Sequence, residues 1–199
     1  MFGLTVNNKI YDGTVTAPLD TSNISYSGLV EGDDFTGTYT GVFADANVGT
    51  NKTVTITPSY TGADVGNYSV TDQSTATGNI VAKTLTATAS KANKTYDATN
   101  AATTNLTLSG LVGTETLNVT NTSSFNNKNV GTGKSVTVNS ITLADGTGLA
   151  ANYSISPGQT TTANVTAKAL TVIASTANKV YDSTTVANTT LTLSGFIGS

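Results

Sequence analysis

The most reactive side chains of this sequence stand in one short motif that occurs three times. The motif reads NKIYDG at 8–13, NKTYDA at 93–98 and NKVYDS at 178–183. Each copy brings an amine, a phenol and a carboxylate close together: Lys9, Tyr11 and Asp12; Lys94, Tyr96 and Asp97; and Lys179, Tyr181 and Asp182. Groups of these types can move protons or form covalent links, so the motif is the first candidate for a functional site.

Two interpretations of this motif are open from the sequence. In an extended strand the lysine and tyrosine side chains lie on one face and the aspartate lies on the other. We expect the tyrosine to fill the edge of a core beneath the lysine stem, and the aspartate to accept hydrogen bonds from the following N–H groups and start a turn. Alternatively, the lysine forms an intramolecular isopeptide bond with an asparagine, which needs a buried acid that the sequence does not indicate.

The composition argues against an enzyme. The chain has 199 residues and contains no histidine, cysteine, tryptophan or arginine. Without histidine it lacks the usual general base near neutral pH, and without histidine or cysteine it lacks the common ligands of zinc, copper and haem. We therefore expect no catalytic residue and no cofactor, apart from the calcium considered below.

Charge and hydropathy argue against nucleic acid and membranes as partners. The net charge is −3 and the lysines are scattered singly, so the chain offers no basic patch for nucleic acid. Its longest apolar stretches are far shorter than the ~20 residues that span a membrane, and its opening, MFGLTVNNK, does not resemble a signal peptide. Abundant Thr, Ser, Asn and Gly together with the lack of cysteine suit a secreted or surface-exposed β-protein, so we predict an extracellular location.

The motif also marks a long internal repeat. Tyr11, Tyr96 and Tyr181 follow one another at intervals of 85 residues. Later landmarks keep nearly the same phase, with shifts of 85 and 82 residues: GNYSV at 66–70 with ANYSI at 151–155, and FADANVGTNKTVT at 43–55 with FNNKNVGTGKSVT at 125–137. Short length changes between these landmarks fall in loops, where they are tolerated best. We predict a first repeat at 1–82, a second at 83–167 and the truncated start of a third at 168–199.

Within each repeat the sequence predicts short strands. Segments such as KTLTATAS at 83–90 alternate apolar and threonine residues with period two, and Gly, Asn and Asp clusters separate them. This pattern is typical of an all-β chain of tandem small antiparallel β-sandwiches of the immunoglobulin-like kind. A tyrosine corner would fix a late strand there, with Tyr68 and Tyr153 as candidates. Because each repeat has little apolar area, we expect neighbouring repeats to pack on one another in an elongated rod.

One group of acidic residues is a candidate cation site. Glu31, Asp33 and Asp34 stand together in VEGDDF at 30–35, and calcium prefers carboxylate oxygens on loops. The second repeat has only Glu115 in the corresponding segment, so the group does not recur. We therefore predict a solvated turn, with a single structural calcium site as the alternative.

These motifs, and the order in which they follow one another, resemble the YDG-type repeats of large bacterial surface adhesins, including proteins of the filamentous-haemagglutinin kind. NKxYDxT, SGLVxGDD, FADxNVGTxKTVT and GNYS follow one another in the first repeat. The second repeat departs in having YDA for YDG and VGTETL for VEGDDF, and the third matches as far as it extends. The resemblance implies a tandem module of long secreted proteins that serves as stalk or scaffold and has no established active site.

We accordingly expect non-catalytic repeats of an extracellular bacterial adhesin or surface filament, which project or assemble surface material for cell adhesion. Their partners are then neighbouring repeats of the same protein. Two alternatives stay open. Exposed loops near Asp33 or Asp45 grip a glycan or a host protein, or the chain joins an extracellular fibre by sharing strands with a neighbour.

Overall fold

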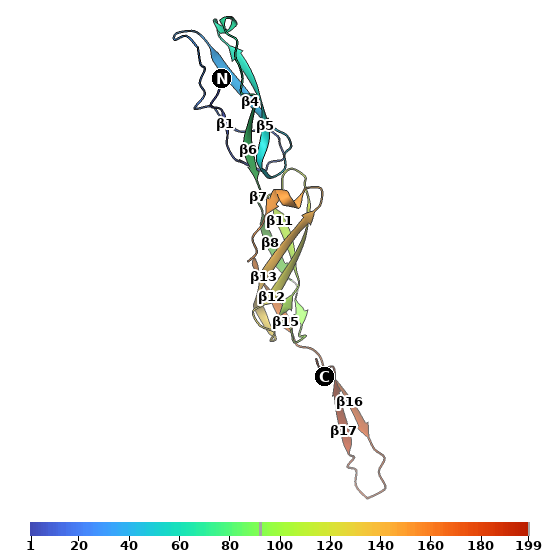
Figure 1. Cartoon of the computed structure of the whole chain (residues 1–199). Helices are drawn as coiled ribbons and strands as arrows, with labels where there is room; N and C mark the ends of the chain where they lie inside the picture. The colour runs from blue at the N-terminus through green and yellow to red at the C-terminus, as the bar shows by residue number, and fades with distance from the viewer. Residues whose placement is uncertain (92, 199) are drawn as a thin grey trace. The chain divides into compact units, whose positions relative to one another are not determined.

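The computed structural model describes residues 1–91 and 93–198, and these form strands and two short 3-10 helices (Figure 1). The prediction of an all-β chain is therefore confirmed. Threonine, valine and isoleucine are frequent in the strands, where β-branched side chains pack well on the pleated surface. In the part of the chain that the structure describes, no helix is long and apolar enough to span a membrane.

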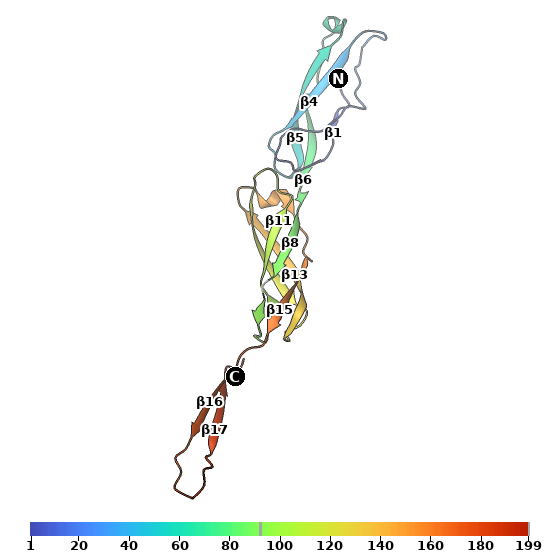
Figure 2. The same ribbon diagram turned by 180° about the vertical axis from the view of Figure 1, so that it is seen from behind.

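The main sheet of the first repeat has the strand order β2-β6-β5-β4. The elements of this repeat are β1 (Thr5–Val6), β2 (Lys9–Ile10), β3 (Leu19–Asp20), β4 (Thr36–Phe43), β5 (Gly49–Thr61), the 3-10 helix η1 (Val65–Asn67) and β6 (Thr75–Val81). β4 pairs antiparallel with β5 from Thr36 opposite Thr61 onward, whereas β2 joins β6 in parallel, with Lys9 opposite Ile80. Figures 1 and 2 show β4, β5 and β6 running side by side.

The second repeat builds the same sheet in the order β9-β15-β13-β12-β10. Its elements are β7 (Lys83–Thr84), β8 (Thr86–Lys91), β9 (Lys94–Thr95), β10 (Ala101–Ala102), β11 (Thr104–Ser109), β12 (Leu117–Phe125), β13 (Gly131–Asp145), η2 (Ala150–Asn152), β14 (Tyr153–Ser154) and β15 (Thr160–Thr166). Both sheets carry a bulge at the corresponding place, between Gly49 and Lys52 in β5 and between Gly131 and Lys134 in β13. The remaining strands, β16 (Thr171–Thr176) and β17 (Thr189–Ser194), form an antiparallel hairpin.

The chain folds into two compact units, and each has its own core. Unit 1 comprises 1–87, 108–119 and 142–156, and unit 2 comprises 88–107, 120–141 and the residues from Pro157 onward. The core of unit 1 consists of Leu4, Tyr11, Ala17, Phe43, Val54, Ile56, Ile80, Leu85 and Tyr153. The core of unit 2 consists of Phe125, Val136, Ala163 and Val165. Unit 1 therefore combines the first sequence repeat with parts of the second, and the repeat boundaries at 82 and 167 stay predictions.

The predicted antiparallel pairing is found in pairs such as β4 with β5 and β13 with β15, but among the described residues three strand pairs are parallel: β2 with β6, β7 with β14, and β9 with β15. Each of these pairs joins strands that are far apart in the sequence, and such a connection permits the parallel arrangement that a tight hairpin forbids.

The last residue of the repeated motif has a positive φ in all three copies. The angle is 78° at Gly13, 64° at Ala98 and 60° at Ser183. Glycine adopts this left-handed conformation readily, whereas a residue with a Cβ atom loses about 1–2 kcal/mol there. Gly13 has a second constraint, because a Cβ atom at this position would lie 3.0 Å from Cγ1 of Val112.

We predict opposite effects from exchanging these residues between the repeats. Ala98→Gly relieves the left-handed strain and raises the free energy of unfolding of unit 2 by about 1 kcal/mol. Gly13→Ala introduces that strain together with the short contact to Val112, and lowers the free energy of unfolding of unit 1 by about 1–3 kcal/mol. Urea unfolding followed by NMR signals of each unit measures both effects, and a shift of the same sign in the two variants contradicts this explanation.

Candidate interaction site at the junction of the repeats

Each copy of the repeated motif folds into a loop around a lysine ammonium. In the first copy Lys9 Nζ donates hydrogen bonds to the Thr14 carbonyl (2.8 Å), the Thr14 hydroxyl (2.7 Å) and the Thr16 carbonyl (2.8 Å). Asp12 Oδ1 lies 2.9 Å from the ammonium and accepts hydrogen bonds from the Thr14 amide and hydroxyl. These oxygen atoms satisfy an ammonium whose lysine is only 9% exposed.

The other two copies reproduce these bonds. Lys94 Nζ donates to the Thr99 carbonyl (2.9 Å) and hydroxyl (3.1 Å) and to the Ala101 carbonyl (2.9 Å), and it lies 2.7 Å from Asp97. The corresponding partners around Lys179 are Thr184, Val186 and Asp182. The role of the threonine in each loop was not predicted. A signal for it was present, since every aspartate of the motif is followed two residues later by threonine.

The lysine and aspartate of each loop lie together, not on opposite faces as predicted. The prediction assumed an extended strand, but β2 ends at Ile10 and the chain turns after the tyrosine. The Lys94 ammonium, with the Thr99 amide and hydroxyl, lowers the pKa of Asp97 to about 2. Among the described residues, the three motif lysines bind only carbonyl, hydroxyl and carboxylate oxygens of Thr, Ala, Val and Asp. No asparagine lies among these partners, so the contacts do not support the isopeptide alternative.

The tyrosine of the motif, in contrast, has a different environment in each copy. Tyr11 is 5% exposed, and its hydroxyl donates to Glu115 Oε1 at 2.6 Å. Tyr96 is half-buried and lines a shallow apolar cavity with Phe196, whereas Tyr181 is 89% exposed. The motif therefore fixes the loop, and the residues packed against the loop decide what the tyrosine does.

Glu115 connects Tyr11 to a second tyrosine within unit 1. Its Oε2 accepts a hydrogen bond from the Tyr153 hydroxyl at 2.7 Å, and that hydroxyl accepts one from the Val112 amide at 3.0 Å. The rings of Tyr11 and Tyr153 meet edge to face, with centroids 5.4 Å apart and an interplanar angle of 80°. This geometry is favoured because the ring edge is positive and the ring face negative. One carboxylate thus joins a residue of the first repeat to a residue of the second.

Asn152 makes a second polar connection beside Tyr153. Its Oδ1 accepts a hydrogen bond from the Val48 amide at 2.9 Å, and its Nδ2 donates to Asn47 Oδ1 at 3.0 Å. The Asn152 side chain is 1% exposed. A buried amide is tolerated when both of its ends are bonded, and these bonds then fix the relative position of the two loops. Asn47 and Val48 belong to the first repeat, so this contact also crosses the junction.

The electrostatics of the junction keep its phenols neutral. Burial raises the pKa of Tyr11 to about 12, and the hydrogen bond to Glu115 acts in the same direction. Burial and then Glu115 also raise the pKa of Tyr153. Both phenols therefore stay protonated and able to donate at neutral pH. The arrangement binds two segments of chain together by hydrogen bonds and ring packing.

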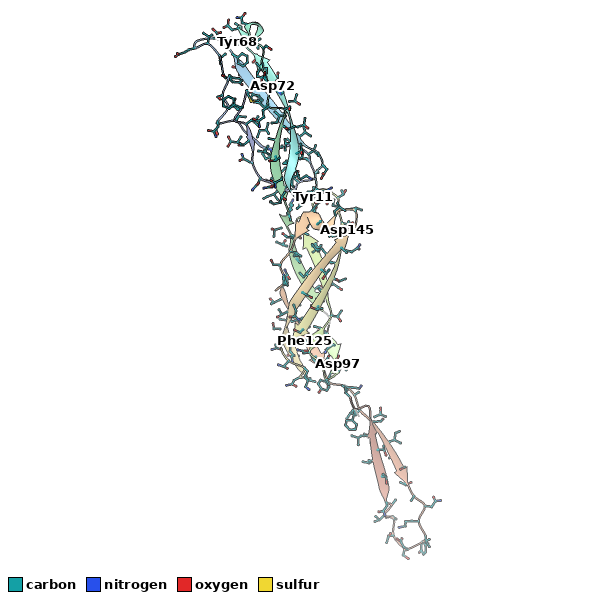
Figure 3. All side chains as sticks on the ribbon, in the orientation of Figure 1. Tyr11, Tyr68, Asp72, Asp97, Phe125 and Asp145 are labelled. Atoms are coloured by element: carbon teal, nitrogen blue, oxygen red, sulfur yellow. The ribbon has the colours of Figure 1, made fainter. Side chains whose placement is uncertain are left out.

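Tyr68 and Asp33 form the counterpart of this arrangement in the first repeat. The Tyr68 hydroxyl accepts a hydrogen bond from the Val30 amide at 3.1 Å and donates one to Asp33 Oδ2. Tyr68 lies at the opposite end of the first repeat from Tyr11 (Figure 3) and is only half-buried. Its bond to the backbone spans 38 residues, whereas a tyrosine corner reaches only a few residues upstream, so it is a different contact from the predicted one.

The acidic group of the first repeat does not assemble into a cation site. Asp33 binds Tyr68, and Asp34 Oδ2 accepts a hydrogen bond from the Ala63 amide at 2.9 Å. Within residues 1–91 and 93–198 no three acidic, histidine or cysteine side chains are placed to hold a metal ion. The calcium alternative at Glu31, Asp33 and Asp34 is therefore not supported, because the aspartates bind groups of neighbouring loops instead.

Both tyrosines of the junction are among the residues predicted from the sequence, whereas Glu115 and Asn152 are not predicted as junction residues. A signal for each was available. Glu115 and Asp33 both follow the valine of SGLV by three residues, so a carboxylate recurs there in both repeats. Asn152 and Asn67 likewise both precede the tyrosine of NYS.

Comparison with known families gives one match. The model of the YDG domain matches the chain twice, at residues 2–77 and 81–163. Tyr11 falls in the first match, and Glu115 and Tyr153 fall in the second. Searches of curated proteins and of solved structures find no significant match.

We predict that Tyr11→Phe lowers the free energy of unfolding of unit 1 by about 1.5–3 kcal/mol, because it removes a hydrogen bond to a partly buried carboxylate. The raised pKa of Tyr11 favours folding below pH 10, and this contribution is lost as the pH rises from 10 towards 12. Urea unfolding followed by far-UV circular dichroism at pH 8 and across this window measures both effects.

Tyr96→Phe is the matched control, since it changes the same motif position where no phenol–carboxylate bond is formed. It should alter stability by less than about 0.5 kcal/mol. Equal losses in the two variants would show that the Glu115 bond contributes nothing to unit 1.

Proposed function

Because the chain belongs to the YDG domain family, we propose that it provides non-catalytic structural repeats of an extracellular bacterial adhesin or surface filament. The repeats project or assemble surface material for cell adhesion. The contact of Tyr11 with Glu115 and Tyr153 carries this proposal. In that contact the motif with the most reactive side chains serves to attach one repeat to the next.

In the first copy of the motif, the lysine and tyrosine side chains have all their polar atoms bound within the chain, and this supports a role without catalysis. The Lys9 ammonium is surrounded by carbonyl, hydroxyl and carboxylate oxygens, and the Tyr11 hydroxyl is buried against Glu115. A catalytic group must reach a substrate in a cavity, whereas these groups are occupied by their own chain. We therefore nominate no catalytic residue.

The proposal includes repeats of the immunoglobulin-like sandwich kind, stacked in line as a rod. The sharing of core residues supports stacking, because Leu85 of the second repeat packs in the same core as Phe43 of the first. Glu115 and Asn152 add hydrogen bonds across the same junction. Directly packed repeats hold their spacing and carry force, which repeats on a flexible linker do not.

The two alternative functions differ in their support. Binding of a glycan or a host protein through acidic loops is weakened, because Asp33 is held by Tyr68 and Asp45 by Lys52 at 2.7 Å. Joining of a fibre by strand sharing stays the second alternative, and no contact among the described residues tests it.

The first test measures whether the repeats are held in a fixed arrangement. The chain has no native cysteine, so Thr57→Cys in β5 and Thr142→Cys in β13 accept two spin labels at exposed positions of different repeats. Double electron–electron resonance should give one narrow distance distribution. Removing the junction contacts with Tyr11→Ala and Glu115→Ala should broaden it. A distribution that is equally broad in both proteins argues against load-bearing repeats.

The second test concerns location. An antibody raised against the two repeats should label intact, unpermeabilised cells of the organism that makes the protein. Brief protease treatment of those cells should remove the signal, while a cytoplasmic marker in the same cells stays unlabelled and uncut. Labelling that appears only after permeabilisation contradicts the extracellular proposal.

A further inference from the structure

We propose that each repeat contains a mechanical clamp, a pair of parallel strands that resists tension applied along the chain. In the first repeat the clamp is β2 with β6, and in the second repeat it is β9 with β15. This inference goes beyond the proposed function, because it depends on strand directions and not on where the protein is located or what it attaches to.

The two strands of each clamp are the first and the last of their sheet along the chain. β2 and β6 hold these places in the sheet β2-β6-β5-β4, and β9 and β15 hold them in the sheet β9-β15-β13-β12-β10. Lys9 lies opposite Ile80 in the first clamp, and Lys94 lies opposite Val165 in the second. The strand by which the chain enters each sheet is therefore hydrogen-bonded to the strand by which it leaves.

The parallel direction decides how tension acts on such a pair. Tension reaches the first strand at its N-terminal end and leaves the last strand at its C-terminal end. In a parallel pair these two points lie at opposite ends of the pair, so the opposed forces run along the strands and load the hydrogen bonds together. In an antiparallel pair the two points would lie side by side, and the bonds would break one after another.

A backbone hydrogen bond extends each clamp to the tyrosine of the repeated motif. The Tyr11 amide donates to the Val81 carbonyl at 2.9 Å. The Tyr96 amide donates in the same way to the Thr166 carbonyl at 2.8 Å. Both clamps therefore have the same hydrogen bond at their C-terminal end, although the two tyrosine side chains have different environments.

The asparagine that opens the motif adds a bond at the other end of each clamp. Asn8 Oδ1 accepts a hydrogen bond from Asn79 Nδ2 of β6 at 3.0 Å, and Asn93 Oδ1 accepts one from the backbone amide of Asn164 in β15 at 2.8 Å. Asn79 Oδ1 also accepts a hydrogen bond from the Asn51 amide in the bulge of β5 at 2.8 Å. Because Asn8 and Asn93 directly precede β2 and β9, tension entering these strands meets the asparagine bonds first.

Within unit 1 the first clamp leads directly into another parallel pair. β6 ends at Val81 and β7 begins at Lys83, and β7 pairs in parallel with β14. The Leu85 amide extends this pair by donating to the Ser154 carbonyl at 2.7 Å. One residue separates the two parallel pairs, so no flexible linker takes up the tension between them.

The test pulls on the main sheet of unit 1 in two directions, using single-molecule force spectroscopy of the full chain. Asn7→Cys with Val81→Cys places handles ahead of β2 and at the end of β6, so that the pull shears the clamp. Thr40→Cys with Thr75→Cys places them on β4 and β6 with β5 between, so that the pull acts across the strands. All four positions are exposed, and the chain has no native cysteine.

At one loading rate, rupture with the shearing handles should need at least about twice the force that rupture across the strands needs. The reason is that bonds loaded together share the pull, whereas bonds loaded across the strands break in turn. Rupture forces that are equal in the two directions, or lower along the clamp, overturn the proposal.

A substitution at Asn8 tests the role of the motif asparagine. With the shearing handles, Asn8→Ala should shorten the lifetime at constant force about fivefold, which is the effect of one ordinary hydrogen bond on a rate. Asn8→Asp keeps an acceptor for Asn79 and should restore the lifetime. With the handles on Thr40 and Thr75, Asn8→Ala should leave the lifetime unchanged. Equal shortening in both directions would show that Asn8 contributes only to general stability and would remove it from the clamp.

Discussion

The Glu115 carboxylate, which accepts one hydrogen bond from Tyr11 and another from Tyr153, is the contact on which the junction depends. A partly buried carboxylate is stable only with donors close by, and phenols serve because burial keeps them protonated. Their rings can then pack edge to face, which brings the neighbouring Asn152 against the loop of Val48. The polar contacts and the shared core of unit 1 therefore support one another.

The three copies of the motif separate what a short sequence determines from what its surroundings determine. The loop around the lysine forms in every copy, although Lys9 is buried and Lys179 is exposed. Its bonds reach only from the motif to residues five and seven positions further on, so the segment carries everything the loop needs. The tyrosine has no such local partner. Its environment changes from buried to exposed as the packing against the loop disappears.

The sequence predicted the features that depend on short distances along the chain. Alternation of threonine with apolar residues predicted the strands, and regular spacing predicted corresponding sheets. The recurrence of a carboxylate after SGLV could have marked Glu115 as a candidate, but its pairing with Tyr11 could not be predicted, because the two residues lie 104 positions apart and one sequence contains no record of pairing. The parallel pairs were missed for the same reason. The Lys9–Asp12 contact was missed because the chain leaves the extended conformation after β2, so alternation no longer decides which side chains meet.

The division of the junction between two repeats has a consequence for how such a gene can change length. Tyr11 stands near the start of one period and Glu115 near the middle of the next, and a carboxylate also occurs in the earlier period as Asp33. An insertion or deletion of one whole period preserves the spacing between the motif tyrosine and the segment that follows SGL in the next period, wherever its breakpoints fall. Copy number can therefore vary without a new interface having to evolve, whereas a deletion of a large part of one period, beyond the few loop residues by which the two repeats already differ, separates the buried partners.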